Sequence, residues 1–269
     1  MRSQERGRAS FARPSDSVWT NARRSCRPER FSGSSGCLSP PSSDLPNTQV
    51  IAPACHDTAS AVGAIPFSHH NLAFISSGTW SLVGTVLPGP LVSELGYELN
   101  ITNEGGVGGT IRYLRNVIGL WMIQEVLREW NEQGIRVTAA QLAEQCMDTS
   151  IEGPYIDVAD DKTFLAPGNM VARINAELEA RGFAEETHPA QVAAIIFRSL
   201  ARRYAQVIDG LKRCTGKPIE RVCIVGGGVK NEALNRLTAL STGLEVVRGS
   251  SESTLIGNVA VQIGALENT

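Results

Sequence analysis

From residue 48 to the end of the chain, short apolar runs alternate with longer stretches in which hydrophobic residues recur every three or four positions. The short runs are typical of strands, and the longer period is typical of amphipathic helices. Strands are expected at residues 50–54, 72–75, 80–87, 97–102, 219–225 and 244–247. Helices are expected at 110–130, 138–147, 169–181, 188–214 and 231–241 and from 253 onward, with a short one opening at His56 and a loop at 153–165. This order of elements predicts an α/β fold, with a mixed sheet flanked by helices.

The stretch from 110 to 130 shows the helical period most fully. Its apolar positions are Leu114, Val117, Ile118, Trp121, Met122 and Val126. A helix there would carry Arg112, Asn116 and Gln124, and it would place Arg112 and Asn116 on one face because they are four residues apart. An ordinary solvated helix face explains these polar residues equally well.

The first 47 residues differ in composition from everything that follows. They are rich in Arg, Ser and Pro, contain no Lys and show neither hydrophobic period. Such a segment cannot bury enough apolar surface to offset the entropy of ordering it, so disorder is expected. A transit peptide and a basic arm for nucleic acid are alternatives, but Glu5, Asp16 and Glu29 count against the first. We favour the remnant of a truncated or frame-shifted start, with a folded domain at 48–269.

Composition argues against several function classes. The chain of 269 residues has a formal net charge of −2 and a pI near 6.1, which give no general attraction to nucleic acid or membrane surfaces. Its six cysteines include no Cys-x-x-Cys pair, and its four histidines show no ligand spacing. This pattern argues against structural zinc and a disulfide framework and favours the cytoplasm. No apolar run approaches the roughly eighteen residues that span a bilayer, and no secretory signal is present.

A carboxylate and a small-residue turn stand close together in the sequence near its start. His56-Asp57-Thr58 opens an Ala-rich helix, with Asp57 or Thr58 as the expected N-cap. The strand that follows ends in Ser76-Ser77-Gly78-Thr79, a turn that offers hydroxyl and backbone donors to phosphate. A carboxylate beside such a turn suits the deprotonation of a hydroxyl that attacks a phosphoryl group. A helix cap and an ordinary turn are the alternative interpretation.

Two glycine-rich loops follow predicted strands. Residues 224–228, Ile-Val-Gly-Gly-Gly, lead into a helix near Asn231, so the backbone there can approach an anionic ligand closely. Asn231 stands where the dinucleotide fingerprint needs a third Gly, and the chain has no Walker motif. The second loop is residues 103–109, and a flexible hairpin turn explains it at least as well as a ligand-binding loop does.

Five segments together resemble one family. They are residues 53–62, 75–81, 102–106, 116–121 and 224–228, the last followed by Asn231, and they occur in this order. The series resembles the C-terminal domain of FGGY carbohydrate kinases, and most closely that of rhamnulokinases, over roughly residues 48 to 266. The resemblance implies the actin-like, ribonuclease-H-like ATPase fold. It also implies that this domain is the second of two lobes, with ATP and sugar bound in the cleft between them.

The resemblance assigns the sugar side of such a cleft to four residues of this chain. Asp57 would be the catalytic base on the sugar hydroxyl. His56 and Thr58 would contact the sugar beside it, and Asn116 would reach it from the 110–130 segment. The N-terminus of a helix favours an ionised carboxylate, which is the form that a base needs.

The nucleotide side falls on three further positions. Thr79 would face the ATP phosphates, Gln124 would lie on the nucleotide side of the predicted helix, and Gly227 would line the nucleotide pocket. The implied cofactors are ATP and Mg²⁺, because phosphoryl transfer depends on positioning and charge stabilisation more than on covalent catalysis.

One element of the family pattern is absent from the sequence. FGGY kinases carry an Asp-x-Gly-Thr loop on their N-terminal lobe, and this chain contains no such motif. The expected function is therefore ATP-dependent phosphorylation of a sugar such as L-rhamnulose, incomplete without an N-terminal lobe as partner. The alternatives are a kinase for another sugar, or a non-catalytic remnant that binds a nucleotide or a protein.

Overall fold

The computed structural model describes residues 51, 53–54, 56–66, 71–159 and 161–267. The segment expected to be disordered, 1–47, lies outside them. The described chain forms a mixed six-stranded sheet in the order β3-β4-β2-β1-β5-β6. Its strands are β1 (Leu72–Ser77), β2 (Trp80–Leu87), β3 (Thr102–Gly105), β4 (Ile111–Ile118), β5 (Arg221–Val225) and β6 (Glu245–Arg248). The pairs β1–β5 and β5–β6 are parallel, and the other pairs are antiparallel. The predicted mixed α/β architecture is confirmed.

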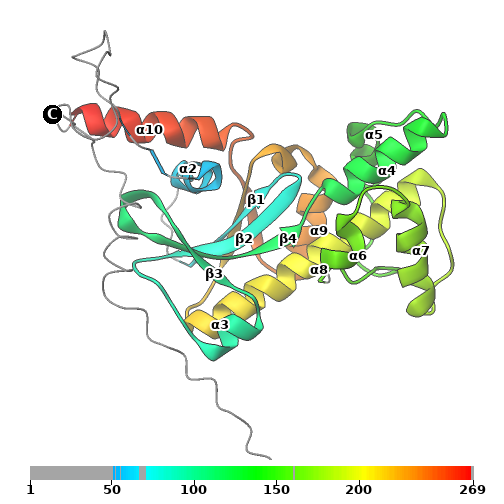
Figure 1. Ribbon diagram of the computed structural model, residues 1–269, viewed down its shortest axis with the longest axis horizontal. Coiled ribbons are helices and arrows are strands. Elements are labelled where there is room, and N and C mark those ends of the chain that lie inside the picture. The colour runs from blue at the N-terminus through cyan, green and yellow to red at the C-terminus, as the bar shows by residue number, and fades with distance from the viewer. Residues whose placement is uncertain (1–50, 52, 55, 67–70, 160, 268–269) are drawn as a thin grey trace, which may run out of the picture.

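Helices cover both faces of this sheet (Figure 1). They are α2 (Asp57–Gly63), α3 (Glu94–Glu98), α4 (Trp121–Glu132), α5 (Ala139–Gln145), α6 (Asp161–Leu165), α7 (Met170–Ala180), α8 (Pro189–Thr215), α9 (Glu232–Thr242) and α10 (Ser253–Glu267). The long helix α8 begins with Pro at its first turn and ends at Gly216, which adopts the left-handed conformation (φ 64°) of a helix terminus. Helices α4 to α7 gather at one end of the sheet in Figure 1.

Two hydrophobic cores hold these layers together. The larger lies between the sheet and the layer of α4, α5, α7, α8 and α9, and it includes Ile75, Val83 and Val117. The smaller lies under α2 and includes Phe74 and Leu114. Because successive strand residues point to opposite faces, the sheet contributes apolar side chains to both cores.

The prediction of a helix over residues 110–130 is wrong for the first half of that range. Residues 111–118 form β4, which pairs with both β2 and β3, and α4 begins only at Trp121. The apolar spacing is misleading because β4 is buried on both faces: Leu114 packs in the core under α2 and Val117 in the core under α8. Arg112 and Asn116 still share a face, since four residues are also two full periods of a strand.

Three smaller expectations also need correction. Residues 97–102 do not form a strand, because α3 ends at Glu98 and β3 begins at Thr102. In the expected strand 50–54, residues 51, 53 and 54 are not in a strand, and residues 50 and 52 lie outside the described part. The expected loop 153–165 contains the short helix α6. The other expected strands and helices are confirmed with small shifts at their ends.

Helix α2 is held in place by α10. The two helices lie side by side in Figure 1, and a Cβ atom added to Gly257 of α10 would lie 1.8 Å from the carbonyl oxygen of Ser60 in α2. A side chain at position 257 would therefore force the two backbones apart. This close approach requires glycine and fixes where the N-terminus of α2 lies.

Candidate functional site

The start of α2 gathers the three residues assigned to the sugar. His56, and not Asp57 or Thr58 as expected, is the N-cap residue, and its Nδ1 accepts from the backbone N–H of Thr58 at 3.3 Å. The same nitrogen lies 2.8 Å from Oδ1 of Asp57. That oxygen accepts from the backbone N–H and the hydroxyl of Thr58, at 2.6 and 3.1 Å. The Asp57 side chain is 72% exposed, so a ligand can reach it.

Asn116 lies on a strand and not on the expected helix. It pairs with Leu82 of β2, which in turn pairs with Ser76 near the carboxyl end of β1. It is exposed, and it is two residues from Leu114, which faces α2. Asn116 is therefore on the sheet face that α2 covers, in the row of residues that crosses the end of β1. No contact between Asn116 and Asp57 is present among the described residues.

Thr79 occupies the tight turn between β1 and β2. The turn is closed by the N–H of Gly78, which donates to the carbonyl of Trp80 at 2.9 Å. It is tied to the start of α4 by the N–H groups of Leu120 and Trp121, which donate to the carbonyls of Gly78 and Thr79, each at 3.0 Å. These bonds place the exposed Thr79 side chain beside the first turn of α4.

Two residues assigned to the nucleotide are in direct contact. The Thr79 hydroxyl donates to Oε1 of Gln124 at 3.4 Å, and Nε2 of Gln124 lies 3.3 Å from the same hydroxyl. Both side chains are exposed. The sequence suggested that Gln124 and Asn116 share one helix, but Asn116 is on β4 and Gln124 is on α4. Gln124 instead contacts Thr79, which lies in the turn between β1 and β2.

The glycine turn after β5 lies against the end of β1. A Cβ atom at Gly228 would lie 2.0 Å from Oγ of Ser77, and one at Gly226, where φ is 84°, would lie 2.9 Å from the carbonyl oxygen of Ser77. At Gly227 an added Cβ atom would meet nothing within 4 Å. The outer two glycines are thus required by packing, whereas Gly227 borders open space where a ligand has room. Asn231 caps α9, with its side chain accepting from the N–H of Leu234 at 3.0 Å.

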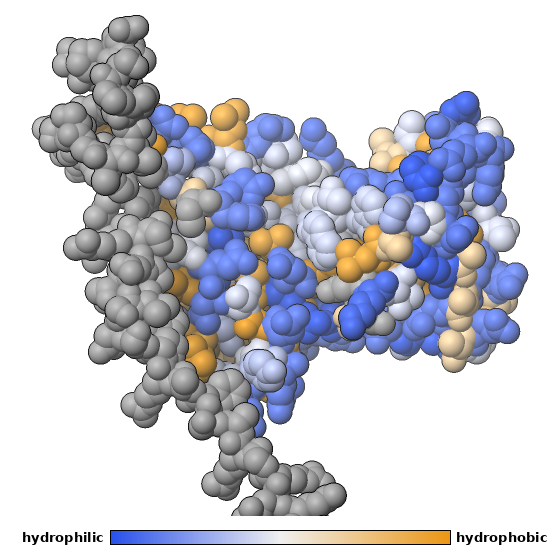
Figure 2. Space-filling model, in the orientation of Figure 1, coloured by the Kyte–Doolittle hydropathy of each residue, from blue (hydrophilic) through white to orange (hydrophobic). Residues whose placement is uncertain are grey.

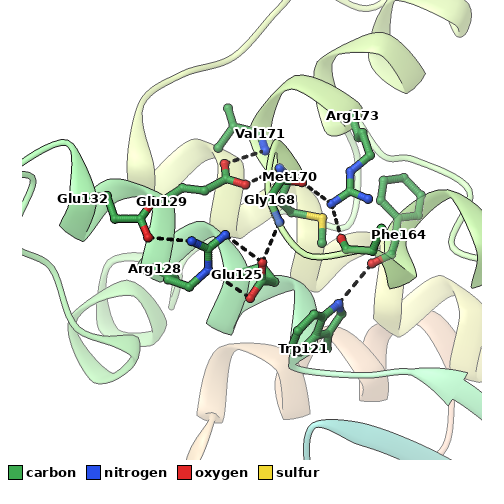
Figure 3. Close-up of polar contacts among 11 residues, drawn as sticks. Trp121, Glu125, Arg128, Glu129, Glu132, Phe164, Gly168, Met170, Val171 and Arg173 are labelled. Carbon is green, nitrogen blue, oxygen red and sulfur yellow. Dashed lines mark hydrogen bonds and ion pairs between the residues drawn. The ribbon is translucent and has the colours of Figure 1, made fainter.

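A set of polar contacts that the sequence analysis missed fixes α4 to the segment before α7 (Figure 3). The Glu125 carboxylate is buried and accepts from the N–H of Gly168 at 2.9 Å and from Arg128 at 3.1 Å. Glu129 accepts from the backbone N–H groups of Met170 and Val171, the second at 3.3 Å. A carboxylate at the first turn of α7 satisfies N–H groups that have no partner within the helix.

The same face of α4 reaches back to the Thr79 turn. The indole N–H of Trp121 donates to the carbonyl of Phe164 at 3.1 Å (Figure 3). The backbone N–H of Trp121 donates to the carbonyl of Thr79. The helical layer α4–α7 is therefore anchored directly beside the Thr79–Gln124 pair. These partners lie about forty residues apart in sequence, so no local pattern identifies them.

The environment of Glu125 predicts a pH-dependent contribution to stability. The hydrogen bonds from Arg128 lower its pKa below the ordinary 4.5, with further lowering by the Gly168 N–H and the charge of Arg173, against burial, which raises it. Because the folded pKa is the lower one, the stabilisation is complete above about pH 4.5 and is lost as pH falls below it. Replacing Glu125 by Gln should lower the free energy of unfolding by about 1–3 kcal/mol at pH 7.

Denaturant unfolding between pH 7 and pH 3 measures this effect. The matched control is Glu132→Gln, because Glu132 bonds to the same Arg128 but its side chain is 63% exposed. Glu132→Gln should lower the free energy of unfolding by less than about 1 kcal/mol. A Glu125→Gln deficit that stays constant down to pH 3, or a control of equal cost, would contradict this assignment.

The part of the chain that the structure describes contains no group of three or more His, Cys, Asp or Glu side chains that could hold a metal ion. Cys146, Cys214 and Cys223 are free thiols. Within the same residues, no helix is both long and apolar enough to cross a membrane.

Comparisons with known proteins show the family to which the chain is similar. The model of the FGGY family of carbohydrate kinases, C-terminal domain, matches residues 73–266. The chain is 42% identical over 218 residues to a rhamnulokinase from Oceanobacillus iheyensis, a match that covers 81% of this chain and 45% of that protein. It is 40% identical over 214 residues to a rhamnulokinase from Bacteroides thetaiotaomicron, covering 79% and 43%. The chain thus spans less than half the length of these relatives.

Solved structures show the same fold. The Plasmodium falciparum glycerol kinase with ADP superposes with a TM-score of 0.57 at 14% identity, over 85% of this chain and 46% of that one. The architecture is therefore that of FGGY sugar kinases, and the chain corresponds to their C-terminal part.

Proposed function

Since the chain belongs to the FGGY family of carbohydrate kinases, as that family's C-terminal domain, we propose that it supplies one lobe of an ATP-dependent rhamnulokinase. The reaction is phosphorylation of a deoxy-ketose such as L-rhamnulose at its primary hydroxyl. The observation that carries the proposal is the contact between Thr79 and Gln124, because it joins two sequence-distant residues that the resemblance assigned to one nucleotide site. The glycine turn packs against Ser77, at the end of the strand that leads to Thr79. The identity to rhamnulokinases supports the choice of sugar.

In this proposal Asp57 accepts the proton of the attacking hydroxyl. Its carboxylate is exposed, and its described contacts from His56 and Thr58 all use Oδ1, which fixes the side chain while the group remains accessible. Asn116, on the sheet face that α2 covers, contacts the sugar, as do His56 and Thr58. A positioned carboxylate of this kind is what phosphoryl transfer to an alcohol needs.

The nucleotide occupies the other side of the cleft. Thr79 faces the phosphates, and Gln124 holds the Thr79 side chain through their hydrogen bond. Gly227 leaves room for the nucleotide to approach the protein backbone. Mg²⁺ bound together with ATP would supply positive charge that neutralises the phosphates. The described residues assigned to the nucleotide, Thr79, Gln124 and Gly227, would contribute hydroxyl, amide and backbone groups there.

The outer face of α10 is where we place a second lobe. Five large aliphatic side chains of this helix are exposed by 44% to 63%: Leu255, Ile256, Val259, Ile263 and Leu266. Figure 2 shows hydrophobic residues gathered over α10 at the upper edge of the molecule. An exposed apolar surface that runs along the length of a helix is typical of an interaction surface. It lies next to α2, so a lobe seated on it would close over Asp57.

A substitution at Gly227 tests the nucleotide site. Gly227→Val adds a branched side chain into open space, so the fold should be unaffected and the melting temperature unchanged. It fills the space that the nucleotide needs, so ADP and ATP binding measured by calorimetry should be lost. The matched control is Gly89→Val, because a Cβ atom there also meets nothing within 4 Å and Gly89 follows the opposite end of β2. Unchanged affinity in Gly227→Val would contradict the site.

A further inference from the structure

Tyr204 of α8 lies beneath the Thr79 turn. Its side chain is 1% exposed and belongs to the larger core, and its hydroxyl shares a 2.7 Å hydrogen bond with Oγ of Ser81. Ser81 is itself fully buried and pairs with Ser77 across the β1–β2 hairpin. The phenol therefore reaches the last pair of residues before the turn that carries Thr79.

These two serines are the point where the parts of the nucleotide site meet. The glycine turn packs on Ser77, since a Cβ atom at Gly228 would lie 2.0 Å from its Oγ. The segment leading to α4 packs on Ser81, since a Cβ atom at Gly119 would lie 2.8 Å from Oγ of Ser81. Thr79 lies between the two serines in sequence. Any shift of the hairpin end would thus change the spacing of all three parts.

The phenol is suited to a fixed structural bond. Burial raises the pKa of Tyr204 to about 12, while the hydroxyl groups of Ser81 and Ser77 act in the opposite direction. The group stays protonated at neutral pH, and a buried phenol of this kind costs free energy unless its hydroxyl is bonded. The bond joins the long helix α8 to the hairpin at one defined place.

We propose that Tyr204 is a positioning residue for the nucleotide site: through Ser81 it fixes the turn that carries Thr79, and with it the spacing between Thr79, Gln124 and the glycine turn. The proposal rests on the nucleotide site described under the proposed function. Tyr204 itself touches no nucleotide. Its contribution is to hold the phosphate-facing turn in the geometry that binding requires, so that less ordering is needed when the ligand enters.

Tyr204→Phe in the full chain tests this role, because the ring keeps its packing and only the hydroxyl is removed. Amide hydrogen exchange should become faster at the N–H groups of Gly78, Leu120 and Trp121, which make the bonds that close the turn and tie it to α4. The Kd for ADP, measured by calorimetry, should rise by roughly fivefold to twentyfold. Ser81→Ala should give the same two changes, and the double variant should add little to either.

The matched control is Thr85→Val. Thr85 is also on β2, and its buried hydroxyl donates to the carbonyl of Leu72 at 2.9 Å, away from the turn. This variant loses one buried hydroxyl bond too, but exchange at the three turn amides and the Kd for ADP should not change.

Unchanged exchange at those amides in Tyr204→Phe would overturn the positioning role, whether or not the chain binds nucleotide. Faster exchange with an unchanged Kd for ADP would overturn it as well, because loosening the turn would then have no effect on ADP binding. Failure of the parent chain to bind ADP would instead overturn the nucleotide site of the proposed function, and the exchange measurement separates these cases.

Discussion

Replacing Asp57 by Asn should reduce kcat by roughly 10²–10⁴-fold, the usual cost of losing a positioned general base. The measurement needs a complete cleft, so we would join residues 51–267 to the segment of the Oceanobacillus iheyensis relative that precedes the match. Asn has nearly the same shape as Asp and can keep the contacts to Thr58, so sugar and nucleotide affinities should change little.

The matched control for this prediction is Asp209→Asn, which removes an exposed carboxylate on α8 whose described ion pair is with Lys212. It should leave kcat unchanged. A chimera that carries Asp57→Asn and still turns over at the parent rate would show that Asp57 only belongs to the start of α2.

By itself, the 269-residue chain should show no detectable sugar phosphorylation. Its sequence contains no Asp-x-Gly-Thr motif, and the proposed function needs a second lobe to hold the γ-phosphate in line with the sugar hydroxyl. Positioning of reacting groups is worth about 7–11 kcal/mol of barrier, which places the remaining rate below detection. Release of ADP from ATP and Mg²⁺ with L-rhamnulose is the assay, and turnover of about one per second would contradict this prediction.

The exposed face of α10 gives this prediction a second readout. An uncovered aliphatic surface of this kind promotes association, so the isolated chain should self-associate in sedimentation experiments. The chimera should remain monodisperse at the same concentration if its second lobe covers that face.

Much of the candidate site could be predicted from sequence because its signals are local. The turn at Thr79 and the glycine turn at Gly227 follow short apolar strands, and both lie where the strand pattern places them. The signal for the helix that begins at Asp57 is also local, although the N-cap residue is His56 and not Asp57 or Thr58. These features depend on residues only a few positions apart.

The remainder depends on contacts between distant parts of the chain. Nothing in residues 111–118 shows that they pair with two other strands, and burial on both faces gives Leu114 and Val117 a helix-like spacing. Asn116 was therefore assigned to the wrong element. The bond between Tyr204 and Ser81 spans 123 residues, and the Glu129 contact with Met170 spans 41. Such pairs are set by packing of the layers, which local periodicity does not encode.

Sugar-dependent ADP release by the chimera tests the central claim most directly. With ATP, Mg²⁺ and L-rhamnulose, the chimera should release ADP, and phosphorus NMR should show a phosphate ester on the primary hydroxyl of the sugar. The signal should disappear in Asp57→Asn and in Gly227→Val. A folded chimera that binds ATP but releases no ADP in response to L-rhamnulose would contradict the assignment of this domain as the base-carrying lobe of a rhamnulokinase.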